Sequence, residues 1–123
     1  MIVGMVSPYR EAVISLKLRG TSGQEEEVEA VIDTGFTEFL TLSPALIHSL
    51  GLARAGIVRV TLADASQVDL EAYLAELIWE GAVRTVSALA ADGGPLVGMS
   101  LLYGHELKLW VVDGGSVIIE RFP

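Results

Sequence analysis

Hydrophobic and polar residues alternate in short runs along most of the chain, and turn residues separate the runs. Residues 12–18 (AVISLKL) alternate, and residues 28–33 (VEAVID) become wholly apolar toward Asp33. Further strand-like runs cover residues 39–42, 57–62, 80–92, 105–112 and 116–122. This succession of short runs predicts an all-β sandwich or barrel. The acidic run EEE at 25–27 is expected to be a solvated loop.

Two segments carry helical signals. In residues 43–52 (SPALIHSLGL), Ser43 is suited to the N-cap, Pro44 to the first helical position and Gly51 to the end of the helix. The middle of residues 96–104 is compatible with a second short helix.

Residues 68–81 fit two periodicities. Their apolar positions match the spacing of an amphipathic helix, and alternate positions fit a strand about as well. The pattern by itself favours a helix here.

Composition narrows the class of protein. A chain of 123 residues with 51% hydrophobic residues predicts one domain over 1–123 with a core of its own. The net charge of −8 and the scattered Lys and Arg argue against a nucleic-acid partner. No apolar stretch reaches the roughly 18 residues that span a bilayer, and MIVGMV lacks the features of a secretion signal. We therefore expect no membrane association and a cytoplasmic location.

Most other candidate chemistry has an ordinary explanation. The absence of cysteine excludes disulfides, thiol nucleophiles and cysteine-ligated metals. His48 is expected on a helix surface and His105 at the start of a strand, without metal-ligand spacing, so we expect no metal and no cofactor. The motif around Ser100 is not that of a serine hydrolase. Trp79, Trp110 and Tyr73 are expected in strands, as core or interface residues.

Asp33 is harder to explain. It stands between an apolar run and the pair Thr34-Gly35, and no basic residue lies between Arg19 and Arg54. Burying a charge without a partner costs several kcal/mol. Its partner must therefore come from a distant segment or from another chain.

The surroundings of the Asp33-Thr34-Gly35 tripeptide are informative. The tripeptide ends an apolar run, precedes a strand and a helix, and is matched further along by Leu96-Val97-Gly98 before another short helix. In these features the chain resembles the retroviral-type (retropepsin-like) aspartic proteases, and more closely their small bacterial and archaeal branch. The resemblance extends over nearly all of residues 12–122.

The resemblance implies a fold. It implies an all-β, mainly antiparallel, closed acid-protease-like barrel with one or two short helices and one half-site in each subunit. Residues 57–80 would form the two arms of a flap hairpin. Residues 68–80 are therefore expected to be a strand, and the resemblance overrides their helical spacing.

The resemblance also implies an activity, aspartic endopeptidase, acting on a peptide or protein substrate. Hydrolysis by this route needs one carboxylate and one carboxylic acid side by side, and each chain supplies only Asp33. In such enzymes a homodimer pairs the same residue from both subunits. At about 3 Å and an effective dielectric of about 20, two ionised carboxylates repel by roughly 5 kcal/mol, so the pair shares one proton.

Further roles follow by matching the family motif. The catalytic set would be Asp33, Thr34 and Gly35, with the Thr34 hydroxyl bonding across the dimer axis. Leu96, Val97 and Gly98 would support the catalytic loop from behind. The substrate-binding set would be Phe36 and Thr37 beside the acid and Ala63, Asp64, Ala65 and Ser66 at the flap tip.

Three residues depart from the family pattern. Phe36 replaces a small residue of the viral enzymes and should make the pocket beside the acid more apolar. Ala65 stands where glycine is usual, which should stiffen the flap or alter its turn. Ser100 replaces an aspartate, which should weaken any structural hydrogen bond there.

Two other functions fit the same sequence. One is a peptide-binding or regulatory module of this fold without useful turnover. The other is a monomeric β-barrel in which Asp33 pairs with an arginine such as Arg84 or Arg121. The chain ends, MIVGMV and VIIERFP, could interleave between subunits or pair within one.

Overall fold

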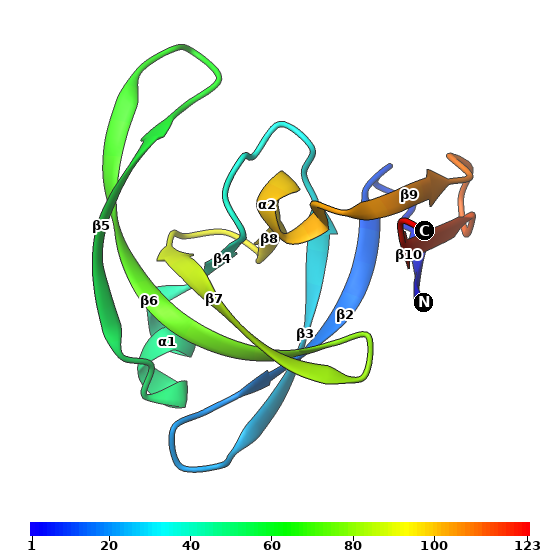
Figure 1. Ribbon diagram of the computed structural model, residues 1–123. Helices are drawn as coiled ribbons and strands as arrows, with labels where there is room; N and C mark the ends of the chain where they lie inside the picture. Colours follow the sequence, from blue (N-terminus) through cyan, green and yellow to red (C-terminus); the bar gives the residue numbers. More distant parts are fainter.

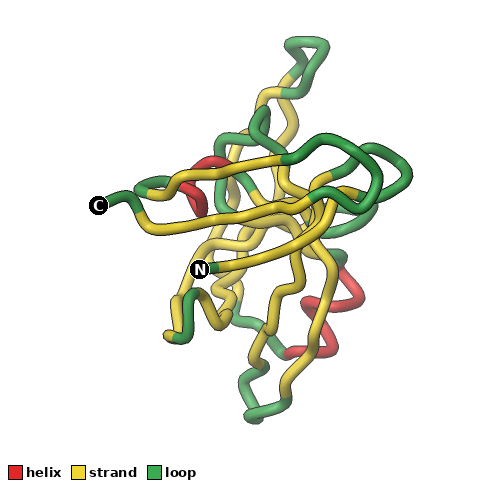
Figure 2. The backbone as a smooth tube through the Cα atoms, turned by 90° about the vertical axis from the view of Figure 1, so that its right-hand side faces the viewer, coloured by secondary structure: helices red, strands yellow, loops and turns green.

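Ten strands and two short helices make up the computed structural model, which describes residues 1–123. The strands are β1 (Ile2–Val6), β2 (Ala12–Arg19), β3 (Glu25–Ile32), β4 (Leu40–Leu42), β5 (Arg54–Thr61), β6 (Gln67–Trp79), β7 (Ala82–Ala90), β8 (Leu96–Val97), β9 (His105–Leu109) and β10 (Ser116–Arg121). The helices are α1 (Pro44–Leu50) and α2 (Met99–Leu102), which appear in Figure 2 as short red segments. Neither helix is long and apolar enough to cross a membrane.

Six of the strands close into a barrel. Strands β6, β7, β4, β8, β3 and β2 are neighbours in that order, and a further pairing of β6 with β2 completes the ring (Figure 1). The closing pairs join Lys17 to Ile78 and Arg19 to Glu76. The pairs β3–β8 and β4–β7 are parallel, and the others in the ring are antiparallel. The predicted all-β barrel is thus confirmed.

The alternating pattern of β2 explains how the barrel is filled. Ile14, Leu16 and Leu18 all point inward and are at most 2% exposed. They belong to a core of 19 buried residues, and burying each such side chain contributes about 1.5–3 kcal/mol. Helix α1 covers the barrel with Ile47 and Leu50.

The predicted caps of α1 are present. The amide of Leu46 donates to the Ser43 hydroxyl over 3.2 Å, and Pro44 begins the helix. Gly51 ends it with a φ of 65°, a left-handed conformation that glycine adopts without strain.

Residues 68–79 lie in strand β6, as the resemblance implied apart from Glu80, which lies in the following turn, and the helical spacing was misleading for a structural reason. Val68, Leu70 and Ala72 lie on one face of β6, whereas the buried residues from Ala75 onward lie on the opposite face. The first face packs near Phe36 and the second against the main core. Because the apolar face changes midway along one long strand, the pattern imitates a helical period.

The two chain ends pair with each other inside one subunit. Strand β1 runs antiparallel to β10, with Ile2 opposite Ile119, and β10 pairs with β9. Both ends therefore lie on the same side of the molecule (Figure 1). In this structure the chain ends therefore pair within one subunit, which is one of the two arrangements that the sequence left open.

Two local expectations were wrong. The acidic run Glu25–Glu27 is not a loop: it begins β3, where cross-strand pairing orders it while its side chains stay exposed, and Glu27 accepts a 2.7 Å hydrogen bond from the Ser15 hydroxyl. Trp110 lies just beyond β9 and its side chain is 53% exposed, so it is not a core residue of the subunit.

A polar cluster joins the terminal strands to the barrel, and sequence reasoning missed it. His105 is almost fully buried; its Nε2 lies 2.7 Å from Glu80 Oε1 and 3.1 Å from the indole nitrogen of Trp79. Arg121 Nε lies 3.9 Å from the same oxygen of Glu80. The hydrogen bond with His105 is the main cause that holds the pKa of Glu80 below its ordinary value.

Candidate active site

The loop between β3 and β4 holds Asp33 in a fixed position. The Asp33 amide donates to the carbonyl of Val97 over 2.9 Å, so the residue is tied to β8 as soon as β3 ends. Its Oδ1 accepts a 3.0 Å hydrogen bond from the Gly35 amide, and its carbonyl accepts one from Phe36. These bonds form a compact turn that leaves the carboxylate half-buried.

The segment that follows β8 supports this loop from behind. The amides of Gly98 and Met99 donate to the carbonyls of Phe39 and Phe36, at 3.0 and 2.8 Å. Only glycine fits at position 98, because a Cβ there would lie 2.0 Å from the carbonyl oxygen of Glu38 and 2.6 Å from the Phe36 ring. The loop and the segment are therefore packed backbone against backbone (Figure 1).

Ser100 contributes to the same contact, contrary to expectation. Its hydroxyl donates to the carbonyl of Thr37 over 2.6 Å, and its amide donates to the carbonyl of Glu38 over 3.2 Å. The short serine side chain reaches the loop because the missing Cβ of Gly98 brings the two backbones close together. The replacement of aspartate has not cost the loop its hydrogen bond.

Phe36 forms the apolar floor next to Asp33. Its ring is 9% exposed and belongs to a small buried cluster with Ala72 and Leu89. Partly buried residues of β5, β6 and β8 pack around this cluster: Val58, Val60, Leu70 and Leu96. Phe36 is therefore surrounded by apolar side chains, and the alternation of residues 57–62 in the sequence marked the β5 residues among them.

Strands β5 and β6 form a long hairpin where the sequence predicted a flap, and we keep that name for it; the hairpin rises from the barrel and ends at residues 62–66 (Figure 1). The amide of Ala65 donates to Leu62 and the amide of Leu62 to Ser66, at 2.9 and 2.8 Å. This is a three-residue hairpin loop whose last position needs a positive φ. Ala65 occupies that position at 69°, where glycine is the usual residue.

Asp64 and Ser66 order the tip of the flap. The amide and the hydroxyl of Ser66 both donate to Asp64 Oδ1, at 2.9 and 2.5 Å. These two bonds lower the pKa of the fully exposed Asp64 carboxyl, and the bond from the hydroxyl has the larger effect. All residues from Leu62 to Ser66 remain exposed.

A pocket of about 370 Å³ separates the Asp33 loop from the flap. Residues 35–38 line one side, and Arg59, Val60 and Thr61 of β5 line the other. Thus the predicted residues Gly35, Phe36 and Thr37 share a pocket with the flap, whereas the flap-tip residues 63–66 stand outside it.

No ion pair of Asp33 forms within the chain, so the predicted pairing with Arg84 or Arg121 is absent. Arg84 instead donates to the carbonyl of Leu101, and Arg121 lies beside Glu80. Thr34 is exposed, and its side chain forms no hydrogen bond within the subunit.

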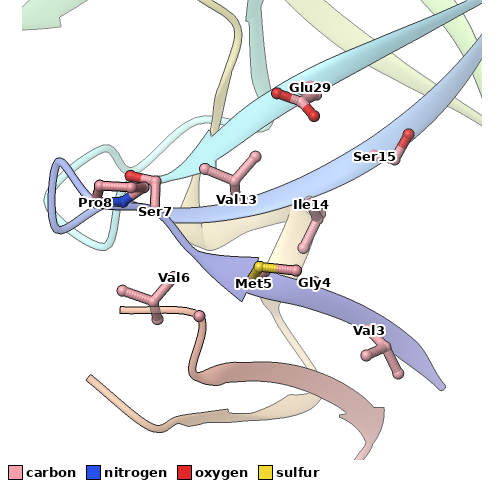
Figure 3. A pocket seen from close by; sticks show the side chains of 11 residues that line it. Val3, Gly4, Met5, Val6, Ser7, Pro8, Val13, Ile14, Ser15 and Glu29 are labelled. Atoms are coloured by element: carbon pink, nitrogen blue, oxygen red, sulfur yellow. The ribbon is translucent and has the colours of Figure 1, made fainter. Parts of the chain in front are cut away.

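The largest pocket lies elsewhere and does not suit hydrolysis. It measures about 690 Å³ and opens beside β1 and β2, where Val3, Met5 and Val13 line it (Figure 3). Glu29 is the one charged residue in its lining. The subunit thus brings no second acid or base of opposite charge state into this groove.

Comparison with known proteins decides the fold. No protein-family model matches the sequence, and no match is found among curated proteins. A crystal structure of a retropepsin-like aspartic protease from Rickettsia conorii matches the chain with a TM-score of 0.63 at 13% sequence identity, covering 98% of this chain and 90% of that one. The chain has the retropepsin-like fold. The suspected resemblance is therefore confirmed at the level of the fold.

The retropepsin-like fold brings the sequence-predicted residues together in two groups. Asp33 to Thr37 and Leu96 to Gly98 form one contiguous unit, since the second segment hydrogen-bonds to the first. Ala63 to Ser66 form a separate unit at the end of the flap. Glu38 and Arg59, which the sequence did not single out, lie between the two groups in the pocket beneath β5.

Proposed function

We propose that the protein is an aspartic endopeptidase whose active site forms when two copies of the chain bring their Asp33 carboxylates together. The observation that carries the proposal is the state of Asp33. It is half-buried, fixed by hydrogen bonds from both sides of its loop, and lacks a cation partner in its own chain. A second carboxylate that shares its proton would supply the missing interaction.

The reaction needs no metal and no covalent intermediate. One Asp33 carboxylate takes a proton from a bound water as the water oxygen attacks the peptide carbonyl carbon. The protonated Asp33 of the partner subunit gives its proton to the carbonyl oxygen. The resulting tetrahedral diol then collapses. The Asp33 that took the water proton gives it to the amine nitrogen as the C–N bond breaks, and the other carboxylate takes a proton from a diol hydroxyl, so the dyad again holds one proton.

The flap gives this chemistry its setting. An extended peptide would lie between the Asp33 loop and the hairpin of β5 and β6, against the apolar surface formed around Phe36. Closure of the hairpin would exclude bulk water, which strengthens the electrostatic interactions of the acid pair. Apolar side chains next to the scissile bond are the substrate class that this surface favours.

The substitution Asp33→Asn tests the proposal. It should abolish cleavage of a peptide library, a loss of at least about 10³-fold, because the base is removed. Light scattering should still find a dimer, because the side-chain oxygen of the asparagine can accept the same hydrogen bond from the backbone N–H of Gly35 and the loop keeps its shape. Unchanged cleavage would refute an Asp33 mechanism.

The second candidate is a peptide-binding or regulatory module that keeps the fold and the dimer without turnover. Ala65 in the left-handed position of the flap turn favours it over a fast enzyme, because a strained turn can restrict hairpin motion. In that case the wild-type protein would bind peptides and cleave none.

A further inference from the structure

Arg84 on β7 is a half-buried cation with unused hydrogen-bonding capacity. Its Nη1 donates to the carbonyl of Leu101 over 3.3 Å, and its Cζ lies 5.9 Å from the centre of the Phe39 ring. A guanidinium has five N–H donors, and the structure accounts for one of them. No buried side-chain nitrogen or oxygen lacks a partner, so the free donors face solvent.

Most of the other basic side chains lie beside an acidic group of the chain. Five Lys and Arg side chains have an acidic group within 4.0 Å: Lys17, Arg54, Arg59, Lys108 and Arg121. Arg10, Arg19 and Arg84 have none, although the chain carries a net charge of −8, and of these three Arg84 lines the pocket described next. The guanidinium of Arg84 is thus half-buried and has no carboxylate of its own chain beside it. It can pair with a carboxylate from another molecule.

A pocket of about 400 Å³ opens at this arginine. Its lining consists of Thr37, Phe39, Arg84, Met99, Ser100 and Tyr103, so Arg84 is the one charged group in it. Met99 and Tyr103 are 46% and 85% exposed and offer apolar surface beside the guanidinium. The pocket thus combines one cation with aromatic and thioether side chains.

The pocket adjoins the candidate active site. Thr37 lines both this pocket and the one between the Asp33 loop and the flap. The backbone of Thr37 is held by the Ser100 hydroxyl, so the wall between the two pockets is fixed. A peptide that lies under the flap and extends past Thr37 would enter the Arg84 pocket.

We propose that the Arg84 pocket binds a carboxylate carried on an apolar group, as an acidic side chain or the C-terminal carboxylate of the peptide in the cleft. A guanidinium fork pairs with a carboxylate through two parallel hydrogen bonds, and the Phe39 ring already positions the guanidinium. The peptide source rests on the proposed function, whereas the binding chemistry depends only on the pocket.

N-acetylphenylalanine is a suitable probe, since it carries a carboxylate beside an aromatic ring. Titrated into the isotope-labelled wild-type protein, it should shift the amide resonances of Thr37, Arg84, Met99 and Ser100 in a saturable manner. The neutral amide of the same compound should bind at least about tenfold more weakly, the loss expected for a charge-assisted pair. Equal binding of acid and amide, or shifts elsewhere in the molecule, would overturn the proposal.

Two variants sharpen the result. Arg84→Gln should reduce binding of the acid to the level of the amide, and Arg84→Lys should restore only part of it because the fork is lost. Arg10→Gln, a change at an exposed arginine in a turn, should leave binding unchanged. Retained affinity in Arg84→Gln would show that another group binds the carboxylate.

The source of the carboxylate is tested with peptides and the uncleaving Asp33→Asn protein. Tighter binding of a peptide with an internal glutamate than of its glutamine analogue indicates a side chain, and tighter binding of a free than of an amidated C-terminus indicates the chain end. If neither pair differs, the peptide source is wrong. These binding measurements need no turnover, so failure of the proposed protease activity would leave their outcome readable.

Discussion

The Asp33 loop and the flap tip contain the same small turn in two different settings. In each, an aspartate Oδ1 accepts a hydrogen bond from the amide two residues later, Gly35 in the loop and Ser66 in the flap, at 3.0 and 2.9 Å. This is a common local device of aspartate that any short segment can form. The local sequence therefore explains what the two turns share.

The settings differ in the contacts beyond the turn. The Asp33 loop receives hydrogen bonds from the segment of Gly98 to Ser100, which lies far away in the chain. The flap tip is bonded only within residues 62–66, and all of these are exposed. Contacts that are local and solvated open at little cost, whereas interlocked distant contacts open only with the fold.

This difference suits a fixed acid beneath a movable hairpin. In the proposed mechanism the carboxylate of Asp33 meets its counterpart in another subunit, so its position has to be held within a fraction of an ångström. A hairpin that admits and covers a peptide has to move. We infer that the same turn serves both purposes because its surroundings, not its sequence, set its rigidity.

The largest effect is expected when the close contact between Gly98 and the Asp33 loop is disturbed. Gly98→Ala places a methyl group 2.0 Å from the carbonyl oxygen of Glu38, and should lower the free energy of unfolding by about 3 kcal/mol or more. Chemical denaturation measures this. Gly94→Ala is the matched control, because no atom lies within 4 Å of the added carbon. Equal stabilities of the two variants would show that the segment does not clamp the loop.

Relieving the flap turn should have a smaller effect of opposite sign. Ala65→Gly removes a left-handed alanine at φ 69°, and should raise the free energy of unfolding by about 0.5 kcal/mol, since the steric relief exceeds the entropy cost of glycine. Thermal unfolding measures it. Ala63→Gly in the same turn, where no positive φ occurs, should instead lower stability by a similar amount. Two changes of the same sign would contradict this account of the turn.

The smallest effect is expected at Asp64, whose pKa is lowered chiefly by the Ser66 hydroxyl. Because the folded turn holds the proton less tightly than the unfolded chain, its bonds are present above the ordinary pKa of the acid. They are lost as the pH falls through the lowered value. In Ser66→Ala the Asp64 pKa should move up toward its ordinary value, as followed by carboxyl carbon resonances. An unchanged titration would mean that the hydroxyl bond is not formed in solution.

The sequence predicted the capped helix α1 and most strands, because these depend on local signals such as caps, alternation and turn residues. It could not predict which distant segments meet. The pattern of β6 misled because its buried face changes along the strand, and His105, predicted at the start of a strand, gave no sign that its side chain would be buried beside Glu80. Arg84 likewise lacks a carboxylate partner because the fold places no acidic side chain beside it, which its neighbours in the sequence do not reveal.

The most direct test of the half-site is a mixing experiment. Wild-type and Asp33→Asn subunits are combined in varied proportions, allowed to exchange, and assayed for cleavage at constant total protein. If both Asp33 residues are needed, activity falls as the square of the wild-type fraction, so an equal mixture keeps about one quarter of the activity. A linear fall to about one half would mean that each subunit works alone, and the account of a shared acid pair would be wrong.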